Sequence, residues 1–118
     1  MPMGRTVGTE RRRSKRIPLS VSVKIESLDH LVLFYGHCNT ADVSLHGCQF
    51  FVTRPFKRGT RLLLDIRDAY HTISVHAHVV RSLPAAPGMK GMLWRVGVEI
   101  TNPGNYWGVE SPPPDWAL

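Results

Sequence analysis

Apolar and polar residues alternate along much of this chain, with the period of two that is typical of half-buried strands. In residues 20–27 the apolar positions are Val21, Val23 and Ile25, and polar residues separate them. Residues 72–82 alternate in the same way over a longer run. The pattern and the turn residues around it predict six strands, at residues 20–27, 31–38, 48–53, 61–66, 72–82 and 93–100.

Segments that contain Gly, Pro, Asp or Asn separate these runs and predict turns. Strand-like runs recur roughly every 8–12 residues, and no segment has a convincing amphipathic helix pattern. These features predict an all-β fold, a small antiparallel six-stranded β-barrel. We expect a loop at residues 39–47, and the prolines of residues 101–118 predict an extended tail that contains two tryptophans.

The chain has 118 residues, enough for one domain, and its composition is that of a globular protein, with 42% hydrophobic and 20% charged residues. We expect a flexible arm at residues 1–16, the barrel at 17–100 and the tail at 101–118. No apolar run reaches the roughly 18 residues needed to cross a bilayer. No apolar stretch follows the N-terminal arginines, as it would in a secretory signal, so we expect a cytoplasmic protein.

The net charge of +6 is concentrated at the N-terminus. Residues 1–16 hold six Lys or Arg and one acidic residue, a net charge of +5. The other 102 residues hold nine basic and eight acidic groups, a net charge of +1. A nearly neutral domain with a cationic arm suits an anionic partner, although a solvated basic tail would give the same charge distribution.

Two short motifs carry the candidate chemistry. The first is Arg12-Arg13-Ser14-Lys15-Arg16, an arginine pair with the spacing RxxxR, and the second is Asp42-Val43-Ser44-Leu45-His46-Gly47, with the pattern DxSxxG. Guanidinium groups bind phosphates and guanine O6 and N7 through paired hydrogen bonds. A carboxylate accepts from the guanine N–H groups that arginine cannot engage, and a glycine-containing turn lets the backbone approach a ligand.

Together, in this order and with strands between and after them, the two motifs resemble those of the PilZ domain, a bacterial receptor for the second messenger cyclic di-GMP. The resemblance extends from about residue 10 to residue 100, and Gly97-Val98-Glu99-Ile100 is similar to the family's closing strand. The register Arg12/Arg16 fits best, because Ile17-Pro18-Leu19 follows directly and the family usually has a proline there. The resemblance implies a PilZ-type, split-barrel-like fold.

The resemblance also implies which residues bind the ligand. Arg12 and Arg16 would contact the phosphates and the Hoogsteen edges of the guanines. Asp42 would accept from guanine N1–H and N2–H₂, and Ser44 would add a hydroxyl hydrogen bond. Gly47 would permit a backbone conformation closed to other residues, or a close approach to the ligand.

Two further residues bear on how the ligand would lie. By the same resemblance, Gly97 would leave room on the barrel face for a base. Arg11 precedes the arginine pair, at a position that in the family influences whether one ligand or a stacked pair is bound. Since arginine stacks on bases, Arg11 favours a stacked pair. Arg13 and Lys15 would give general electrostatic support.

Alternative interpretations of several residues stay open. Asp42 and Ser44 could instead hydrogen-bond their own backbone in a turn, and Gly97 could mark a bulge. Trp107 and Trp116 could pack over exposed barrel surface, which is the preferred interpretation, or form a docking surface for a partner.

The sequence favours neither catalysis nor a metal or other cofactor. It contains no recognisable nucleophile, base and acid combination. His76 and His78 have a spacing that a metal could use, but no CxxC or HExxH pattern accompanies them, so we expect no metal site. Cys38 and Cys48, on either side of the DxSxxG motif, are expected to be reduced, to act as small hydrophobic residues and to lie near one another.

The hypothesis from sequence is a non-enzymatic cyclic di-GMP receptor, whose arm orders over the ligand and presents a new surface to a downstream protein partner. We expect no membrane insertion. One alternative is a nucleotide-independent PilZ-like adaptor. The other is a basic β-barrel that binds nucleic acid through its arm, which ranks last because the strands show no ladder of stacking aromatic residues.

Overall fold

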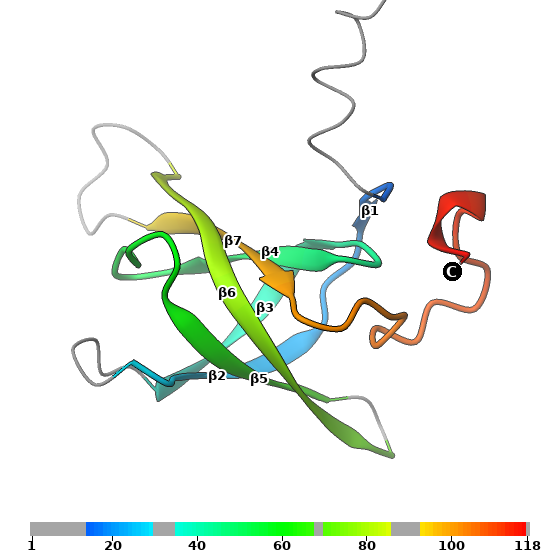
Figure 1. Cartoon of the computed structure of the whole chain (residues 1–118), viewed down its shortest axis with the longest axis horizontal. Helices are drawn as coiled ribbons and strands as arrows, with labels where there is room; N and C mark the ends of the chain where they lie inside the picture. The colour runs from blue at the N-terminus through cyan, green and yellow to red at the C-terminus, as the bar shows by residue number, and fades with distance from the viewer. Residues whose placement is uncertain (1–13, 30–34, 68–69, 86–92, 118) are drawn as a thin grey trace, which may run out of the picture.

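Seven antiparallel strands form nearly all the regular structure of this computed structural model, which describes residues 14–29, 35–67, 70–85 and 93–117 (Figure 1). They are β1 (Ile17–Pro18), β2 (Ser22–Ser27), β3 (Tyr35–Val43), β4 (Gly47–Val52), β5 (Arg61–Arg67), β6 (Thr72–Pro84) and β7 (Trp94–Ile100). A single turn of 3₁₀ helix, η1 (Pro114–Trp116), lies near the C-terminus. Within the described residues, no helix is long and apolar enough to cross a membrane.

The residues that alternate along the sequence point alternately to the inside and the outside of a barrel. In β2, Val23 and Ile25 are fully buried, and in β5 Leu62 and Leu64 are fully buried, while the residues between them are half-buried or exposed. Alternate side chains of a strand point to opposite faces, so one face of each strand fills a common interior. Phe50 of β4 is the largest fully buried side chain of this core.

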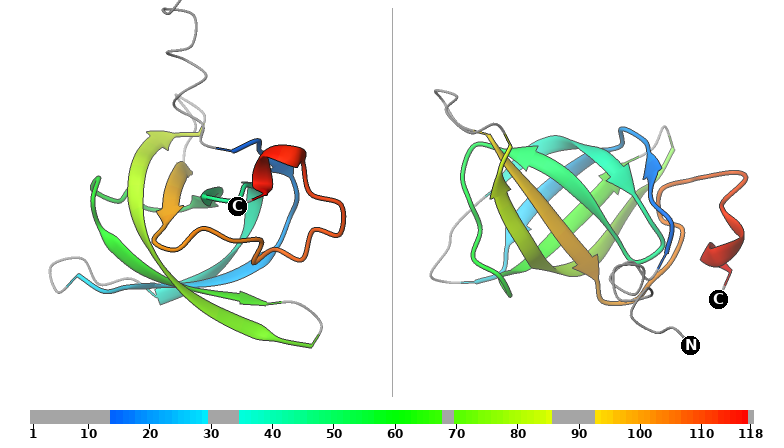
Figure 2. Two further views of the ribbon diagram at one scale, coloured as in Figure 1. Left: turned by 45° about the vertical axis from the view of Figure 1, so that its right-hand side comes forward. Right: turned by 90° about the horizontal axis from the view of Figure 1, so that it is seen from above.

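The sheet closes on itself (Figure 2). Its strand order is β1-β3-β2-β5-β6-β7-β4, and β3 also pairs with β4, so six strands form a closed ring and β1 lies outside it. Closure leaves the six barrel strands without a free edge. The predicted fold, a small six-stranded antiparallel barrel, is confirmed.

Two details differ from the sequence-based expectation. A strand was predicted at residues 31–38 and a loop at 39–47, but β3 continues to Val43, so Asp42 lies in a strand and only Ser44–His46 form the turn. The first strand of the sheet was not predicted either. It is only two residues long, Ile17 opposite Val43 and Pro18 opposite Asp42, too short to leave an alternating pattern.

Thr40 joins β1 and β2 along one edge of β3. Its hydroxyl donates to Leu19 O at 2.6 Å and accepts from Val21 N at 2.9 Å, and its own N–H donates to Val21 O at 3.0 Å. The side chain is 4% exposed. The hydroxyl therefore satisfies two backbone groups where the chain leaves β1 and enters β2, and it fixes where β1 lies.

The C-terminal segment folds back over the outside of the barrel, next to β1 (Figure 2). Trp107 is 5% exposed and Trp116 is 4% exposed, and both belong to the buried apolar cluster. The segment is largely without regular structure, as expected, apart from the short η1. Of the two interpretations of these tryptophans, the structure supports packing against the domain.

We expect Thr40→Val to destabilise the domain, because it leaves Leu19 O and Val21 N without their partner. Each unsatisfied buried group costs about 1–3 kcal/mol. Thr40→Ser keeps the hydroxyl and loses one methyl group, worth about 0.8 kcal/mol. Urea unfolding of both variants measures the difference; a valine variant as stable as the serine variant would show that the hydroxyl is dispensable.

Candidate functional site

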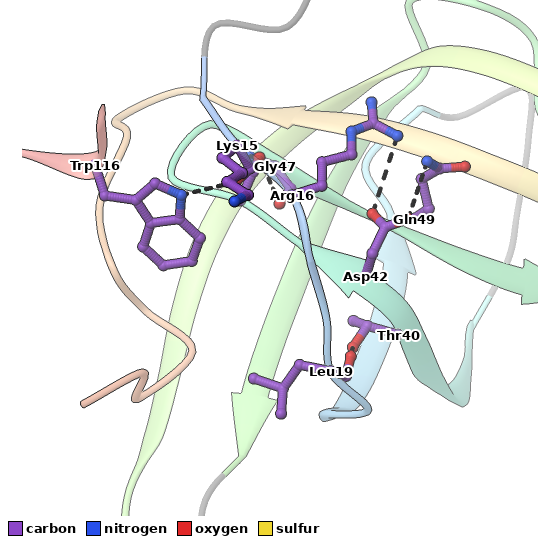
Figure 3. A network of polar contacts seen from close by, with 9 residues as sticks. Lys15, Arg16, Leu19, Thr40, Asp42, Gly47, Gln49 and Trp116 are labelled. Atoms are coloured by element: carbon purple, nitrogen blue, oxygen red, sulfur yellow. Dashed lines mark hydrogen bonds and ion pairs between the residues drawn. The ribbon is translucent and has the colours of Figure 1, made fainter. Parts of the chain in front are cut away.

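The pairing of β1 with the end of β3 brings the two motifs together. Pro18 lies opposite Asp42 and Ile17 opposite Val43, so Arg16, one residue earlier, lies at the start of the Ser44–Gly47 turn. Arg16 Nη1 is 3.9 Å from Asp42 Oδ1 (Figure 3). Residues 26 positions apart thus form an ion pair at one corner of the barrel.

One oxygen of Asp42 is buried and has an unused hydrogen-bonding capacity. Asp42 Oδ2 accepts a hydrogen bond from Gln49 Nε2 at 3.2 Å, across the β3–β4 pairing. Oδ1 has no hydrogen-bond partner within the described part of the chain, and Arg16 at 3.9 Å is its neighbouring charge. A buried carboxylate oxygen normally accepts hydrogen bonds, so Oδ1 is an acceptor available to an added donor.

Ser44 uses its hydroxyl within the turn. Its backbone N–H donates to Gly47 O at 2.8 Å, Gly47 N donates to Ser44 Oγ at 3.1 Å, and Oγ donates back to Gly47 O at 3.3 Å. The alternative in which this residue hydrogen-bonds backbone in a turn is confirmed for Ser44. The Asp42 carboxylate instead accepts a hydrogen bond from Gln49 Nε2 and forms an ion pair with Arg16.

Gly47 is required by the packing of two strands. Among the described residues, positive φ angles occur only at Gly59 and Gly108, so the expectation that Gly47 adopts a backbone conformation closed to other residues is wrong. A Cβ at Gly47 would lie 1.9 Å from Val98 O. The glycine lets the start of β4 lie against β7, and so holds the turn close to the barrel.

An open cavity of about 270 Å³ lies between the residues before β1, the Ser44–Gly47 turn and the middle of β6. Arg16, Ser44 and Gly47 line it, as do three residues that the sequence analysis did not select: His46, Arg81 and Glu99. Two guanidinium groups therefore border the same opening, with one carboxylate. Such a site favours an anionic ligand with planar acceptor groups.

A bulge in β6 places Arg81 at this cavity. The β6–β7 register shifts between Val79 and Arg81, and beyond the shift Arg81 pairs with Gly97. The adjacent apolar residues Val79 and Val80 break the alternation of this strand. That break is a signal from which the bulge, and the outward position of Arg81, could have been predicted.

Gly97 lies in the centre of a row of residues that are paired across neighbouring strands. Asp42 lies opposite Gln49, Gln49 opposite Gly97, and Gly97 opposite Arg81. A Cβ at Gly97 would meet the side chains of Gln49, Val80 and Arg81 at 3.8–3.9 Å, which is ordinary contact. The fold does not require glycine here, and the bulge lies opposite it in β6 rather than in its own strand.

The end of the predicted arm is held against the barrel. Ser14 is 3% exposed, and its hydroxyl lies 3.1 Å from His46 Nδ1. Residues 14–16 were expected to belong to the flexible arm, but their contacts make them part of the folded domain. Arg11 and Arg12 lie outside the described residues, so the structure brings Arg16, Asp42, Ser44, Gly47 and Gly97 to one region and leaves the other two as predictions.

The other residues considered in the sequence analysis are the candidate metal-binding histidines and the two cysteines. Within the described residues, no group of three or more His, Cys, Asp and Glu side chains is placed to hold a metal ion. His78 Nε2 lies 3.7 Å from Glu99 Oε1.

Cys38 and Cys48 are free thiols. Burial raises the pKa of the Cys38 thiol to about 12, and burial, with Cys38 and Asp42 nearby, also raises that of Cys48.

The model of the PilZ domain matches residues 10–105 of this sequence. The chain belongs to the PilZ domain family. PilZ domains form a family of cyclic di-GMP receptors, and they are generally ligand-binding or adaptor domains rather than enzymes. No curated protein matches the chain.

Three solved structures have a fold similar to that of this chain. The PilZ domain of YcgR from Escherichia coli, with c-di-GMP, is 16% identical with a TM-score of 0.60, over 78% of this chain and 79% of that one. The PilZ domain of CeSA from a cellulose-synthesizing bacterium is 20% identical with a TM-score of 0.56, over 80% and 87%.

The third structure is the Bacillus subtilis inhibitor of motility MotI/DgrA. It is 21% identical with a TM-score of 0.59, over 80% of this chain. The match covers 44% of MotI, so this chain spans less than half the length of that protein. At these identities the three structures show a shared fold.

We expect both thiols to be unreactive in the folded protein, because the thiolate is the nucleophile and burial raises the pKa of both thiols well above pH 8. Iodoacetamide at pH 8, followed by mass spectrometry, should label neither cysteine in native protein and both in urea. Rapid labelling of native Cys38 would contradict the raised pKa of that partly buried thiol.

Proposed function

We propose that this chain is a cyclic di-GMP receptor without enzymatic activity. The observation that carries the proposal is the carboxylate of Asp42, whose buried Oδ1 lacks a hydrogen-bond donor among the described residues and lies 3.9 Å from Arg16 Nη1. A guanine base supplies N–H donors for the carboxylate, while its O6 and N7 and the phosphates supply acceptors for guanidinium groups. The two side chains are complementary to two edges of one base: the carboxylate to the N1–H and N2–H₂ donors, and the guanidinium to O6 and N7 on the Hoogsteen edge.

Membership of the PilZ family supports this choice of ligand, as does the solved PilZ domain of YcgR with c-di-GMP. The cavity beside Arg16 is bordered by a second cation, Arg81, which suits a ligand with two phosphates. Gly97 lies between Gln49 and Arg81, where a base would lie against the strands.

The mechanism begins at the arm. Arg16 stands at the edge of the barrel, and Arg12 would reach the ligand from the preceding residues. Binding would order the arm over the dinucleotide and create a surface that a downstream protein partner recognises. With Arg11 stacked on a base, the site would take a pair of stacked ligands. Ser44 and Gly47 would act chiefly by holding the turn in place.

Isothermal titration calorimetry with cyclic di-GMP at physiological salt tests the proposal, with GTP and a short single-stranded RNA as controls. We expect selective binding of the cyclic dinucleotide and, for a stacked pair, two ligands per chain. No binding by a folded sample would favour the nucleotide-independent adaptor. Equal binding of RNA, with a steep dependence on salt, would favour the nucleic-acid alternative.

We expect Asp42→Asn and Arg16→Ala each to weaken binding about ten- to hundredfold, because hydrogen bonds to charged groups contribute about 1.5–3 kcal/mol. Arg58→Ala, in an exposed turn after β4, removes the same charge as Arg16→Ala and should bind like the wild type. Calorimetry on the three variants, with thermal melts to confirm folding, gives the comparison. Wild-type affinity in the Asp42 variant would overturn its role as the acceptor.

Gly97→Ala tests whether Gly97 is needed for ligand binding or for folding. The added methyl meets its neighbours at ordinary contact distances, and alanine loses less backbone entropy than glycine, so the melting temperature should stay the same or rise. If a base lies against Gly97, the same methyl causes overpacking worth about 1–3 kcal/mol and a clear loss of affinity. Unchanged affinity would remove Gly97 from the site.

A further inference from the structure

The two tryptophans of the C-terminal segment each donate a hydrogen bond to the backbone of one motif. Trp107 Nε1 donates to Ser44 O at 2.8 Å, within the DxSxxG turn. Trp116 Nε1 donates to Lys15 O at 2.7 Å, within the RxxxR motif (Figure 3). Both tryptophans are almost fully buried; the bond of Trp107 is itself buried, and that of Trp116 to Lys15 O is partly buried.

η1 takes up both backbone hydrogen-bonding groups of Lys15. While Trp116 donates to Lys15 O, Asp115 Oδ2 accepts from Lys15 N at 2.8 Å. The turn of η1 that presents these two side chains is closed by bonds from Trp116 N to Pro113 O and from Ala117 N to Pro114 O. Lys15 directly precedes Arg16, so η1 sets the position from which the Arg16 side chain departs.

Hydrogen bonds around the first tryptophan hold the start of the C-terminal segment. Asn105 bonds Val109 twice, with Nδ2 donating to Val109 O at 2.8 Å and Oδ1 accepting from Val109 N at 3.2 Å. Gly104 N donates to Leu45 O at 3.0 Å, which ties the start of the segment to the turn after β3. These bonds fix the part of the segment around Trp107 relative to the turn after β3.

We propose that residues 102–117, which we term the C-terminal strap, position Arg16 for the ligand, with Asp115 and Trp116 as the positioning residues. This inference rests on the proposed function, because Arg16 is positioned for the ligand named there. β1 is only two residues long, and a chain that precedes so short a strand frays unless other contacts hold it. The strap supplies those contacts, and it lowers the entropy lost when the ligand binds.

The strap also connects the two motifs through hydrogen bonds. One tryptophan bonds the backbone of the turn that follows Asp42, and the other bonds the backbone before Arg16. A ligand that bridges Asp42 and Arg16 therefore binds two points already held by one segment. Any movement of Lys15 upon binding is transmitted first to η1.

Limited trypsin digestion tests the holding contact without any ligand, because Lys15 and Arg16 are themselves trypsin sites. Trp116→Phe keeps the ring and removes the N–H donor, and Asp115→Ala removes the acceptor. We expect cleavage after Lys15 to become about three- to tenfold faster in both variants, the effect of losing one hydrogen bond. Asp115→Asn keeps an acceptor oxygen and should restore the wild-type rate.

Glu110→Ala is the matched control, because it removes the same charge as Asp115→Ala from an exposed position in the same segment. It should be cleaved like the wild type. Thermal melts show whether the barrel is intact in each variant. Cleavage after Lys15 at the wild-type rate in both Trp116→Phe and Asp115→Ala would overturn the proposed strap.

Calorimetry with cyclic di-GMP then tests positioning. We expect Trp116→Phe and Asp115→Ala to bind about three- to tenfold more weakly while thermal melts show a folded barrel, and Asp115→Asn and Glu110→Ala to bind normally. Wild-type affinity in variants that trypsin cleaves faster would overturn the positioning role and leave the proposed function intact. If the wild type itself does not bind, the proposed function fails together with the ligand role of the strap, and digestion still decides whether the strap holds Lys15.

Discussion

The pairing of Ile17 and Pro18 with Val43 and Asp42 determines whether this domain has a site at all. The closed barrel forms without β1, since six other strands complete the ring. Without that pairing, Arg16 would have no fixed relation to Asp42. The pairing is short, and it depends on Thr40 at one end and on the contacts of Ser14 and Lys15 at the other. A small number of polar contacts thus sets the geometry of the candidate site.

The barrel interior is not available to a ligand, because apolar side chains from all six strands fill it. A ligand would therefore bind on the outer face, where the described residues form the open cavity beside Arg16. Three local irregularities shape that face: the Ser44–Gly47 turn, the β6 bulge at Arg81 and the gap in side chains at Gly97. The site consists of these irregularities together with the residues that precede β1.

Much of the barrel could be predicted from sequence, because burial on one face of a strand leaves a period of two that single residues such as Val23 and Ile25 display directly. β1 could not, since two residues carry no period. The extension of β3 to Val43 was also missed, because three of the four residues from Asn39 to Asp42 are polar and the strand conformation there depends on pairing with β4. The motifs identified the candidate residues, whereas the roles of Thr40 and Trp116 depend on contacts between residues far apart in sequence.

The division of the site between an arm and a barrel bears on selectivity. A polyanion of any kind satisfies the charge of the N-terminal residues, and charge alone would give binding that salt abolishes. Asp42 opposes such ligands, because a carboxylate beside Arg16 repels phosphate unless a donor such as a guanine N–H faces it. In the proposed receptor, discrimination would belong to the barrel and affinity largely to the arm. Selection of the ligand would then depend on β1 and the C-terminal strap, which hold Arg16 beside Asp42.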